Sequence, residues 1–246
     1  GDRSHWKETL VEIGHEVNVI TLEPNASNKG RLDPFYICLN IKDAENLALK
    51  ICVYLSKINQ QKERAEWIAI RNAVRDVAAE PKPCMDKVIK KLLEMPEVEA
   101  GYEMGSFLAT YQDLSFATLL FGDGEPVDAL DIENAINVLQ IQNLKMPKAN
   151  KKPEDFDMEE MLSMAMMFPI GEFAHDFIKY DSSIMKLVFI DESWFMEKTD
   201  IGKDIIDRLQ REGRSKNAGV FRATQAIKDV DDETKALIGL KFIFQN

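Results

Sequence analysis

Two adjacent carboxylates, Asp191 and Glu192, follow directly on the short run Lys186 to Ile190. Four of those five residues are apolar, and the run is rich in Val, Ile and Phe, which predicts a β-strand buried on both faces. A strand that ends in two acids delivers both charges at its carboxyl end, where ligands bind in an open α/β sheet. Carboxylates in that place can hold Mg²⁺ and activate water.

The same pattern builds the Walker B element of an ATPase. In that interpretation Asp191 fixes Mg²⁺ through water, and Glu192 orients or activates the attacking water. The alternative is a strand that ends in a solvated acidic turn, because four apolar residues followed by two acids also occur at ordinary strand exits.

The segment after the acid pair predicts a helix and then a second strand. The helix begins near the N-cap Thr199, carries one apolar stripe at four-residue spacing and ends at Gly213 as a C′ stop. Residues 218–225 then predict a short strand that ends in Thr224 and Gln225. If the two strands are neighbours, the acid pair and Gln225 converge on one edge, where Gln225 can hydrogen-bond a water molecule or a γ-phosphate.

Residues 186–246 resemble the C-terminal motor domain of the type IV secretion and conjugative-transfer ATPases, which are RecA-like motors. That family typically has an apolar strand ending Asp-Glu-Ala-Trp, an Arg-rich turn with Lys-Asn, and a strand ending Ala-Thr-Gln. The matching text here is FIDESW, REGRSKNAG and RATQ, with Ser193 in place of the usual Ala. Residues 30–35 resemble a further family element, usually Asn-Pro-Phe, in which Asp33 holds the Asn position.

The resemblance implies an α/β fold with a mainly parallel RecA-like sheet flanked by helices. It implies ATP and Mg²⁺ as cofactors, with Asp191 as the Mg²⁺ ligand through water, Thr224 at the nucleotide, and Glu192 and Gln225 as catalytic residues. It also implies a hexameric ring of the same ATPase, contacts with inner-membrane components of a transfer complex, DNA in the assembled ring, and a cytoplasmic location at the membrane.

Three arginines lie between the two predicted strands, and RecA-like ring motors place an arginine finger in this region. A planar guanidinium suits that role because it stabilises the spread charge of a phosphoryl transition state. We expect Arg214 to be the finger, with Arg211 next. The alternative is helix surface charge, since Asp207 lies four residues before Arg211.

No Gly-x-x-x-x-Gly-Lys-Ser/Thr motif occurs in the 246 residues, although a phosphate cradle needs such glycine N–H groups and a lysine. Residues 121–126 have no following Lys and carry acids, and no strand leads into residues 213–219. We therefore expect a chain cut through a domain, without its N-terminal strand and P-loop, that binds nucleotide weakly or not at all and is inactive alone.

Between the predicted core segments 1–41 and 132–246, residues 42–131 predict an inserted all-helical subdomain; a separate helical domain is the alternative. A helix from Trp6 to Ile13 and a strand from Val17 to Leu22 precede it. The predicted insertion helices span 44–58, 63–80, 84–95 and 102–119. After it come a strand over 135–141 and a Met-rich helix over 158–168, either a core face or an adaptable docking surface, with a kink or break at Pro169.

Composition narrows the function classes. A net charge of −11 and a pI near 4.9 argue against a general nucleic-acid-binding face. Cys38, Cys52 and Cys84 have no metal or redox spacing, so we expect reduced thiols and no structural zinc. No run of 18 apolar residues and no signal peptide occurs in this chain.

Two functions from different classes remain. One is an ATP-hydrolysing motor for conjugation or secretion, and a DNA-repair or helicase motor is its nearest rival. The other is a non-catalytic RecA-like interaction module of a membrane-associated transfer complex. The combination of Asp191, Glu192 and Gln225 favours the motor, because a vestigial site has no physical need for two carboxylates at a sheet edge.

Overall fold

The computed structural model describes residues 12, 14, 16–128, 130, 136–148, 151–191 and 199–223. The chain divides into two compact units, one formed by residues 1–145 with 158–169, the other by residues 146–157 with 170–246. Each unit contains a parallel pair of strands together with helices, so the predicted α/β class is confirmed. The domain boundaries at 41 and 132 stay a prediction.

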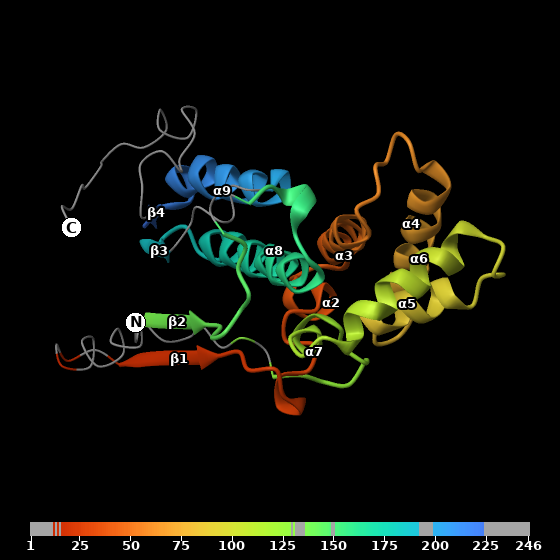
Figure 1. Ribbon diagram of the computed structural model, residues 1–246. Coiled ribbons are helices and arrows are strands. Elements are labelled where there is room, and N and C mark those ends of the chain that lie inside the picture. The colour runs from red at the N-terminus through yellow and green to blue at the C-terminus, as the bar shows by residue number, and fades with distance from the viewer. Residues whose placement is uncertain are drawn as a thin grey trace. The chain divides into compact units, whose positions relative to one another are not determined.

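The first unit contains strands β1 and β2, which pair in parallel from Val17 opposite Ile136 to Thr21 opposite Gln140 (Figure 1). A run of helices connects the two strands, as the periodicity predicts, but residues 102–119 are divided among three short helices and do not form one. The elements are β1 (Val17–Thr21), η1 (Ala26–Asn28), α2 (Pro34–Ile37), α3 (Ile41–Ser56), α4 (Arg64–Ala78), α5 (Met85–Leu93), α6 (Ala100–Ala109), η2 (Thr110–Asp113), α7 (Ala117–Leu120) and β2 (Ile136–Gln140).

The helices of this unit pack through their apolar stripes. Leu47, Ile51 and Leu55 recur along α3 and are almost fully buried, as the helical spacing requires. Polar side chains hydrogen-bond both ends of α3. The Asn40 side chain caps its N-terminus by accepting from the Asp43 N–H, and near its C-terminus the Leu55 carbonyl accepts from the buried Tyr111 hydroxyl at 3.0 Å. Burial of apolar side chains together with satisfied polar groups holds the bundle.

Helix α8 (Met158–Lys179) begins in the first unit and continues into the second. Its first half carries methionines that are at most 8% exposed from Met161 to Met167, so they form a core face, and the docking-surface alternative is wrong for them. The helix is continuous, so the predicted break at Pro169 is wrong, while a kink stays a prediction. Phe168, the residue before Pro169, is fully buried and packs edge-on against Tyr54 with ring centroids 5.0 Å apart.

The second unit contains the remaining half of α8 and a strand–helix–strand sequence. Strands β3 and β4 pair in parallel, from Lys186 opposite Ala218 to Ile190 opposite Arg222. Because parallel strands need a crossover, the intervening helix is the expected connection. The elements are η3 (Pro153–Asp155), β3 (Lys186–Ile190), α9 (Asp200–Gly213), η5 (Arg214–Lys216) and β4 (Ala218–Arg222).

One face of the β3–β4 pair is open. Leu187, Phe189 and Phe221 are 44%, 68% and 42% exposed, and the two phenyl rings stack at 4.8 Å. The prediction that the 186–190 strand is buried on both faces is therefore wrong within the described residues. The apolar run predicted burial but could not say that helices of this unit would cover only one side of the sheet.

No helix among the residues that the structure describes is long and apolar enough to cross a membrane. The three cysteines are free thiols, and burial raises the pKa of Cys52 to about 12.

Candidate functional site

The predicted acid pair lies at the end of β3. Asp191 is the first residue after the strand and is exposed in a turn. Beside it, the Ala223 N–H donates to the Ile190 carbonyl at 2.9 Å, which extends the parallel ladder past the last paired residues. The condition set by the sequence, that the two strands are neighbours, is therefore met. Glu192, Thr224 and Gln225 lie outside the described residues.

Arg222 is a further charged residue at the end of β4 and was not predicted as a site residue. It pairs with Ile190 in the ladder and is half-buried, one position before the point where Asp191 leaves the sheet. A guanidinium at the carboxyl end of β4 places a fixed positive charge near the strand ends. The only signal for it was its place at the head of the RATQ motif.

Helix α9 begins as predicted. The buried Thr199 side chain accepts a hydrogen bond from the Gly202 N–H at 3.0 Å and so caps the helix. Along the predicted stripe, Ile205 and Leu209 are almost fully buried. The buried apolar stripe is the face through which α9 packs against its own unit. The Thr199 cap determines the residue at which the helix begins after the acid pair.

Helix α9 ends at Gly213 as predicted, but Gly213 does not take the C′ role. Gly213 is the last helical residue, and the left-handed residue is Asn217, with a φ of 54°. A glycine fits at 213 because a Cβ there would lie 2.9 Å from the Ala218 carbonyl oxygen. The chain therefore leaves α9 through the short helix η5 and enters β4 after Asn217.

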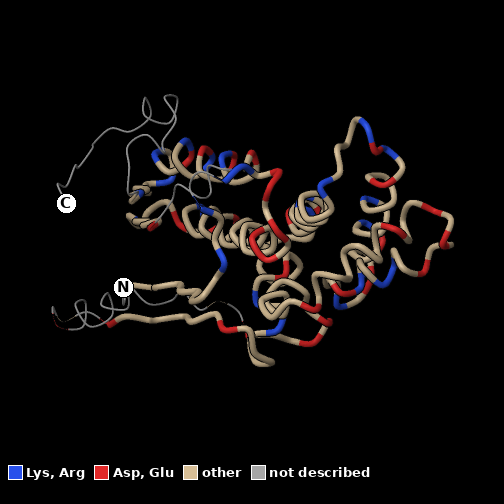
Figure 2. Tube along the Cα trace, in the orientation of Figure 1, with Lys and Arg blue, Asp and Glu red and all other residues tan. Residues whose placement is uncertain are grey.

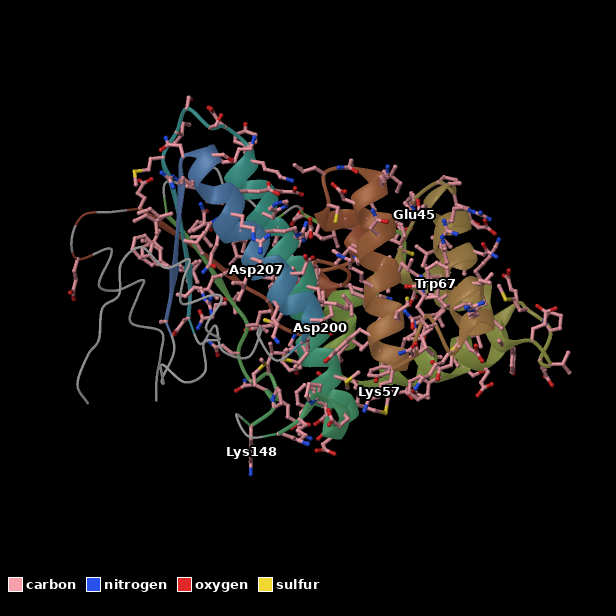
Figure 3. All side chains as sticks on the ribbon, turned by 90° about the horizontal axis from the view of Figure 1, so that it is seen from above. Glu45, Lys57, Trp67, Lys148, Asp200 and Asp207 are labelled. Atoms are coloured by element: carbon pink, nitrogen blue, oxygen red, sulfur yellow. The ribbon has the colours of Figure 1, made fainter. Side chains whose placement is uncertain are left out.

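The two arginine-finger candidates lie at this end of α9. Arg214 is exposed at the start of η5. Arg211 is 70% exposed at its side chain and lies 4.0 Å from Asp207, one turn earlier, a surface pair of the kind weighed as the alternative. Figure 3 shows Asp207 on α9. Such a pair contributes little to stability in water, and the finger role of either arginine stays a prediction.

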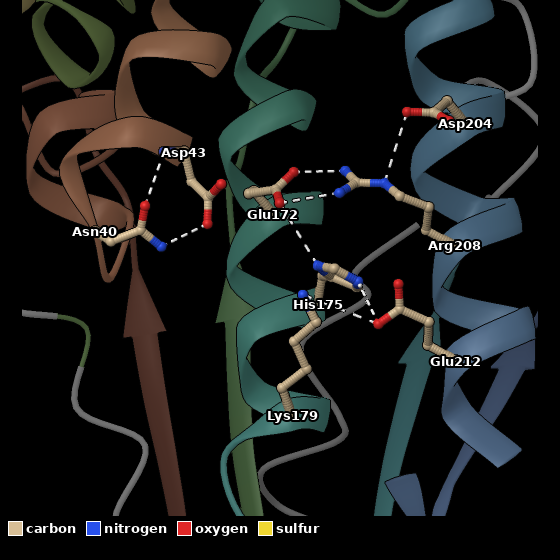
Figure 4. Close-up of polar contacts among 8 residues, drawn as sticks. All are labelled: Asn40, Asp43, Glu172, His175, Lys179, Asp204, Arg208 and Glu212. Atoms are coloured by element: carbon tan, nitrogen blue, oxygen red, sulfur yellow. Dashed lines mark hydrogen bonds and ion pairs between the residues drawn. The ribbon is translucent and has the colours of Figure 1, made fainter. Parts of the chain in front are cut away.

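A polar cluster joins the second half of α8 to α9 and was not predicted from the sequence (Figure 4). Arg208 donates to the Glu172 carboxylate through its two terminal guanidinium nitrogens, at 3.1 and 2.6 Å. His175 lies between two carboxylates, with Nε2 3.0 Å from Glu212 and Nδ1 3.5 Å from Glu172. Burial alone would raise the pKa of Glu172, but the contacts with His175 and Arg208 outweigh it and lower the pKa to about 2.

The glycines of residues 121–126 serve a structural role in the first unit. The Gly122 N–H and the Met85 N–H donate to Asp33 Oδ2 at 2.9 and 2.7 Å, and the Phe35 N–H donates to Oδ1 at 3.0 Å. The Gly124 N–H donates to the Tyr36 hydroxyl. These N–H groups are therefore occupied, which agrees with the rejection of this segment as a phosphate cradle.

Asp33 is fully buried at the centre of these contacts. Burial raises the pKa of its carboxyl to about 7, although the three N–H donors oppose the shift because they favour the charged form. The side chain accepts hydrogen bonds from the start of α2, the start of α5 and the segment after α7. It therefore holds these three segments of the helical region together.

Charges alternate along α9. In Figure 2, Lys and Arg are interspersed with Asp and Glu along this helix. Helix α9 is therefore not a uniformly basic surface of the kind that binds a nucleic-acid backbone.

Comparison with known proteins gives three findings. The family described as AAA-like domain matches residues 1–246. A protein of Bacillus subtilis (strain 168), the uncharacterized protein YddE, is 30% identical over 159 residues, which are 64% of this chain and 19% of that protein. The solved structure of VirB4 from Thermoanaerobacter pseudethanolicus aligns with 96% of this chain and 64% of its own, with a TM-score of 0.66 and 14% identity.

The structural likeness confirms the predicted RecA-like α/β fold, since it extends over nearly the whole chain. The chain spans about a fifth of the length of the bacterial relative and about two thirds of the solved structure.

Proposed function

Because the chain belongs to the AAA-like domain family, we propose that it forms part of an ATP-hydrolysing motor that powers conjugative DNA transfer or type IV secretion. The membership agrees with the predicted family. The observation that carries the proposal is the parallel β3–β4 ladder, which brings the exits of both motif-bearing strands to one sheet edge. In an open α/β sheet that edge is the ligand side.

The residues at this edge have the right donor chemistry for a nucleotide with its metal ion. Asp191 offers an exposed carboxylate, a hard oxygen donor of the kind Mg²⁺ prefers. Mg²⁺ bound there with ATP would neutralise phosphate charge. In this proposal Asp191 holds the metal through water, Glu192 takes a proton from the attacking water, Gln225 orients that water, and Thr224 contacts the nucleotide.

The proposed working form is a ring of identical subunits, with Arg214 of one subunit directed at the nucleotide of the next. Its exposure at the end of α9 supports this role, because a finger must reach out of its own subunit. Arg211 is the second candidate. Inner-membrane components of a transfer complex are the proposed partners, on the cytoplasmic side, and DNA is the proposed cargo or contact in the ring.

The test is ATP hydrolysis by the natural protein that contains this chain. We expect Asp191→Asn and Arg214→Ala each to lower kcat at least a hundredfold, on the scale typical of metal ligands and arginine fingers, while the far-UV circular dichroism spectrum is unchanged. Lys216→Ala is the matched control, since it removes a charge from the same short helix η5. Full turnover by Arg214→Ala would remove the finger assignment.

A second measurement concerns the 246 residues alone. Because they hold no Gly-x-x-x-x-Gly-Lys-Ser/Thr cradle, we expect weak or no binding of a fluorescent ATP analogue. Micromolar binding would contradict this part of the proposal and would point to a different set of phosphate contacts.

A further inference from the structure

Helix α4 has a solvent face on which arginines surround an exposed isoleucine. This α4 face consists of Arg64, Ile68, Arg71 and Arg75, which recur at three- and four-residue spacing and so share the side of the helix opposite its buried stripe. The three arginines are exposed, and Ile68 is 51% exposed. The α4 face is therefore cationic with an apolar centre, although the chain as a whole has a net charge of −11.

The arginines of the α4 face are available to a partner. Arg64 and Arg71 form no ion pair with any residue that the structure describes, and Arg75 meets the adjacent Asp76 at 3.4 Å in an exposed contact of the kind that contributes little in water. The Arg71 guanidinium lies over the ring of Trp67, 5.4 Å from its centroid, and Figure 3 shows Trp67 on α4. A guanidinium held in this way loses less side-chain entropy when it binds a carboxylate.

The turn between α5 and α6 has the same arrangement with the opposite charge. Val98 is 96% exposed, and the exposed Glu97 and Glu99 lie on either side of it in the chain. The Glu99 N–H donates to the Pro96 carbonyl at 2.8 Å, which closes a β-turn over residues 96–99. Such turns favour Gly, Asn, Asp and Ser at their centre, so turn geometry alone does not account for a β-branched apolar residue there.

The base of this turn is closely packed. A Cβ on Gly101 would lie 2.0 Å from the Met95 sulfur and 3.3 Å from the Ala69 Cβ, so the start of α6 fits tightly against the base of the turn and against α4. In Figure 1 the turn projects from the end of α5 and α6, and Figure 2 shows acidic residues on it and basic residues along α4. Because its base is fixed, the turn is presented to a partner at little cost in conformational entropy.

We propose that the 96–99 turn of one copy of this chain docks on the α4 face of a second copy. Val98 packs against Ile68, and the two glutamates of the turn pair with the arginines around it. The contact joins two different surfaces, so each copy keeps one of them for the next copy, and a ring forms where the rotation closes. Its place in a ring rests on the proposed function, whereas the contact itself does not depend on nucleotide chemistry.

The match between the two surfaces identifies a second copy as the occupant. Each surface has one exposed apolar side chain between charges, and the signs of the charges are opposite. Removing the two apolar side chains from water stabilises such a contact, and the complementary charges select the partner and its register. A nucleic acid would match the charge of the α4 face, but it would leave Ile68 and Val98 in water.

The first test is sedimentation velocity of the natural protein that contains this chain, over a series of concentrations. Arg71→Glu and Glu97→Arg should each raise the concentration needed for half-maximal assembly about tenfold, because each sets like charges against one another. The double variant Arg71→Glu/Glu97→Arg exchanges the charges and should return close to the wild-type value. Asp113→Arg, which reverses an exposed acid on η2 of the same unit, is the control and should assemble like the wild type.

The second test detects the contact directly by chemical crosslinking. The natural protein with Ile68→Cys is mixed with a tagged preparation carrying Val98→Cys and treated with a short bismaleimide. We expect a crosslinked pair that contains one chain of each kind. Ile41→Cys is the matched control for Ile68→Cys, because Ile41 is an isoleucine of the same unit with 50% exposure against 51%, and it should not link to Val98→Cys.

Several results would overturn the inference: a monomeric wild type at all concentrations, single reversals that assemble normally, a double variant that is not restored, or equal crosslinking by Ile41→Cys. Normal assembly of Arg71→Glu together with lost binding to a single-stranded oligonucleotide would assign the α4 face to nucleic acid instead. ATP hydrolysis by a protein whose reversals assemble normally would refute the contact and leave the proposed function intact. Charge-exchange rescue in a protein without ATPase activity would do the opposite.

Discussion

Replacing Asp33 by Asn should change how the stability of the helical unit depends on pH. The Asp33 carboxyl is fully buried, and burial raises its pKa from 3.8 to about 7. Between those values the folded state keeps a proton that the unfolded state has lost. The free energy of unfolding therefore falls as pH rises through this window, and the contribution is complete only below pH 3.8.

The size of the effect follows from the pKa difference. Each pKa unit corresponds to roughly 1.4 kcal/mol, so the whole window is worth about 4 kcal/mol, and the part between pH 4.5 and pH 7.5 about 3 kcal/mol. Asn cannot ionise, so Asp33→Asn should lack this slope. It can still accept from the Met85 and Gly122 N–H groups through one oxygen, but it loses the bond from the Phe35 N–H, at a cost of about 1 kcal/mol.

The two stability curves should therefore cross. Asp33→Asn should be less stable than the wild type near pH 4 and more stable near pH 8. Urea unfolding followed by far-UV circular dichroism at several pH values measures this directly. Asp113→Asn is the control, because it removes an exposed carboxyl from the same unit. Parallel curves for the wild type and Asp33→Asn would show that the buried carboxyl stays ionised, held by its three N–H donors.

Three further predictions test the packing. Tyr111→Phe leaves the Leu55 carbonyl without its buried donor and should lower the free energy of urea unfolding by about 1 kcal/mol, with an unchanged value contradicting the contact. Gly171→Val places a side chain against Ile205 and should cost at least ~2 kcal/mol in thermal unfolding, while survival at the wild-type Tm would mean that the helices part without cost. Asn217→Val puts a β-branched residue at φ 54° and should cost about 1–2 kcal/mol, whereas Asn217→Gly should be close to neutral in the same assay.

Local patterns in the sequence predicted much of the fold. The spacing of Leu47, Ile51 and Leu55 predicts a helix because the same side chains must face the core at every turn. Thr199 predicts a helix start because its hydroxyl can accept from an N–H within its own turn. An apolar run that ends in two acids predicts a strand, and it also predicts that a ligand binds at the carboxyl end of that strand.

Contacts between distant parts of the chain could not be predicted in this way. Asp33 accepts from N–H groups 52 and 89 residues away, and no local period carries that information. Glu172 and Arg208 are 36 residues apart and lie on two different helices. In the sequence, each of these two residues has the pattern of an ordinary surface charge. Apolar composition also could not separate a strand buried on one face from one buried on both, as Phe189 shows.

If the acid pair after β3 supports ATP hydrolysis, Glu192→Gln in the natural protein that contains this chain should block turnover and leave ATP binding intact. The substitution keeps size and hydrogen bonding but removes the group that accepts the proton from water. We predict that the variant binds ATP with Mg²⁺ as tightly as the wild type and turns it over at least a hundredfold more slowly in a single-turnover assay. Wild-type turnover by Glu192→Gln, or a wild type that binds ATP and never hydrolyses it, would contradict the account.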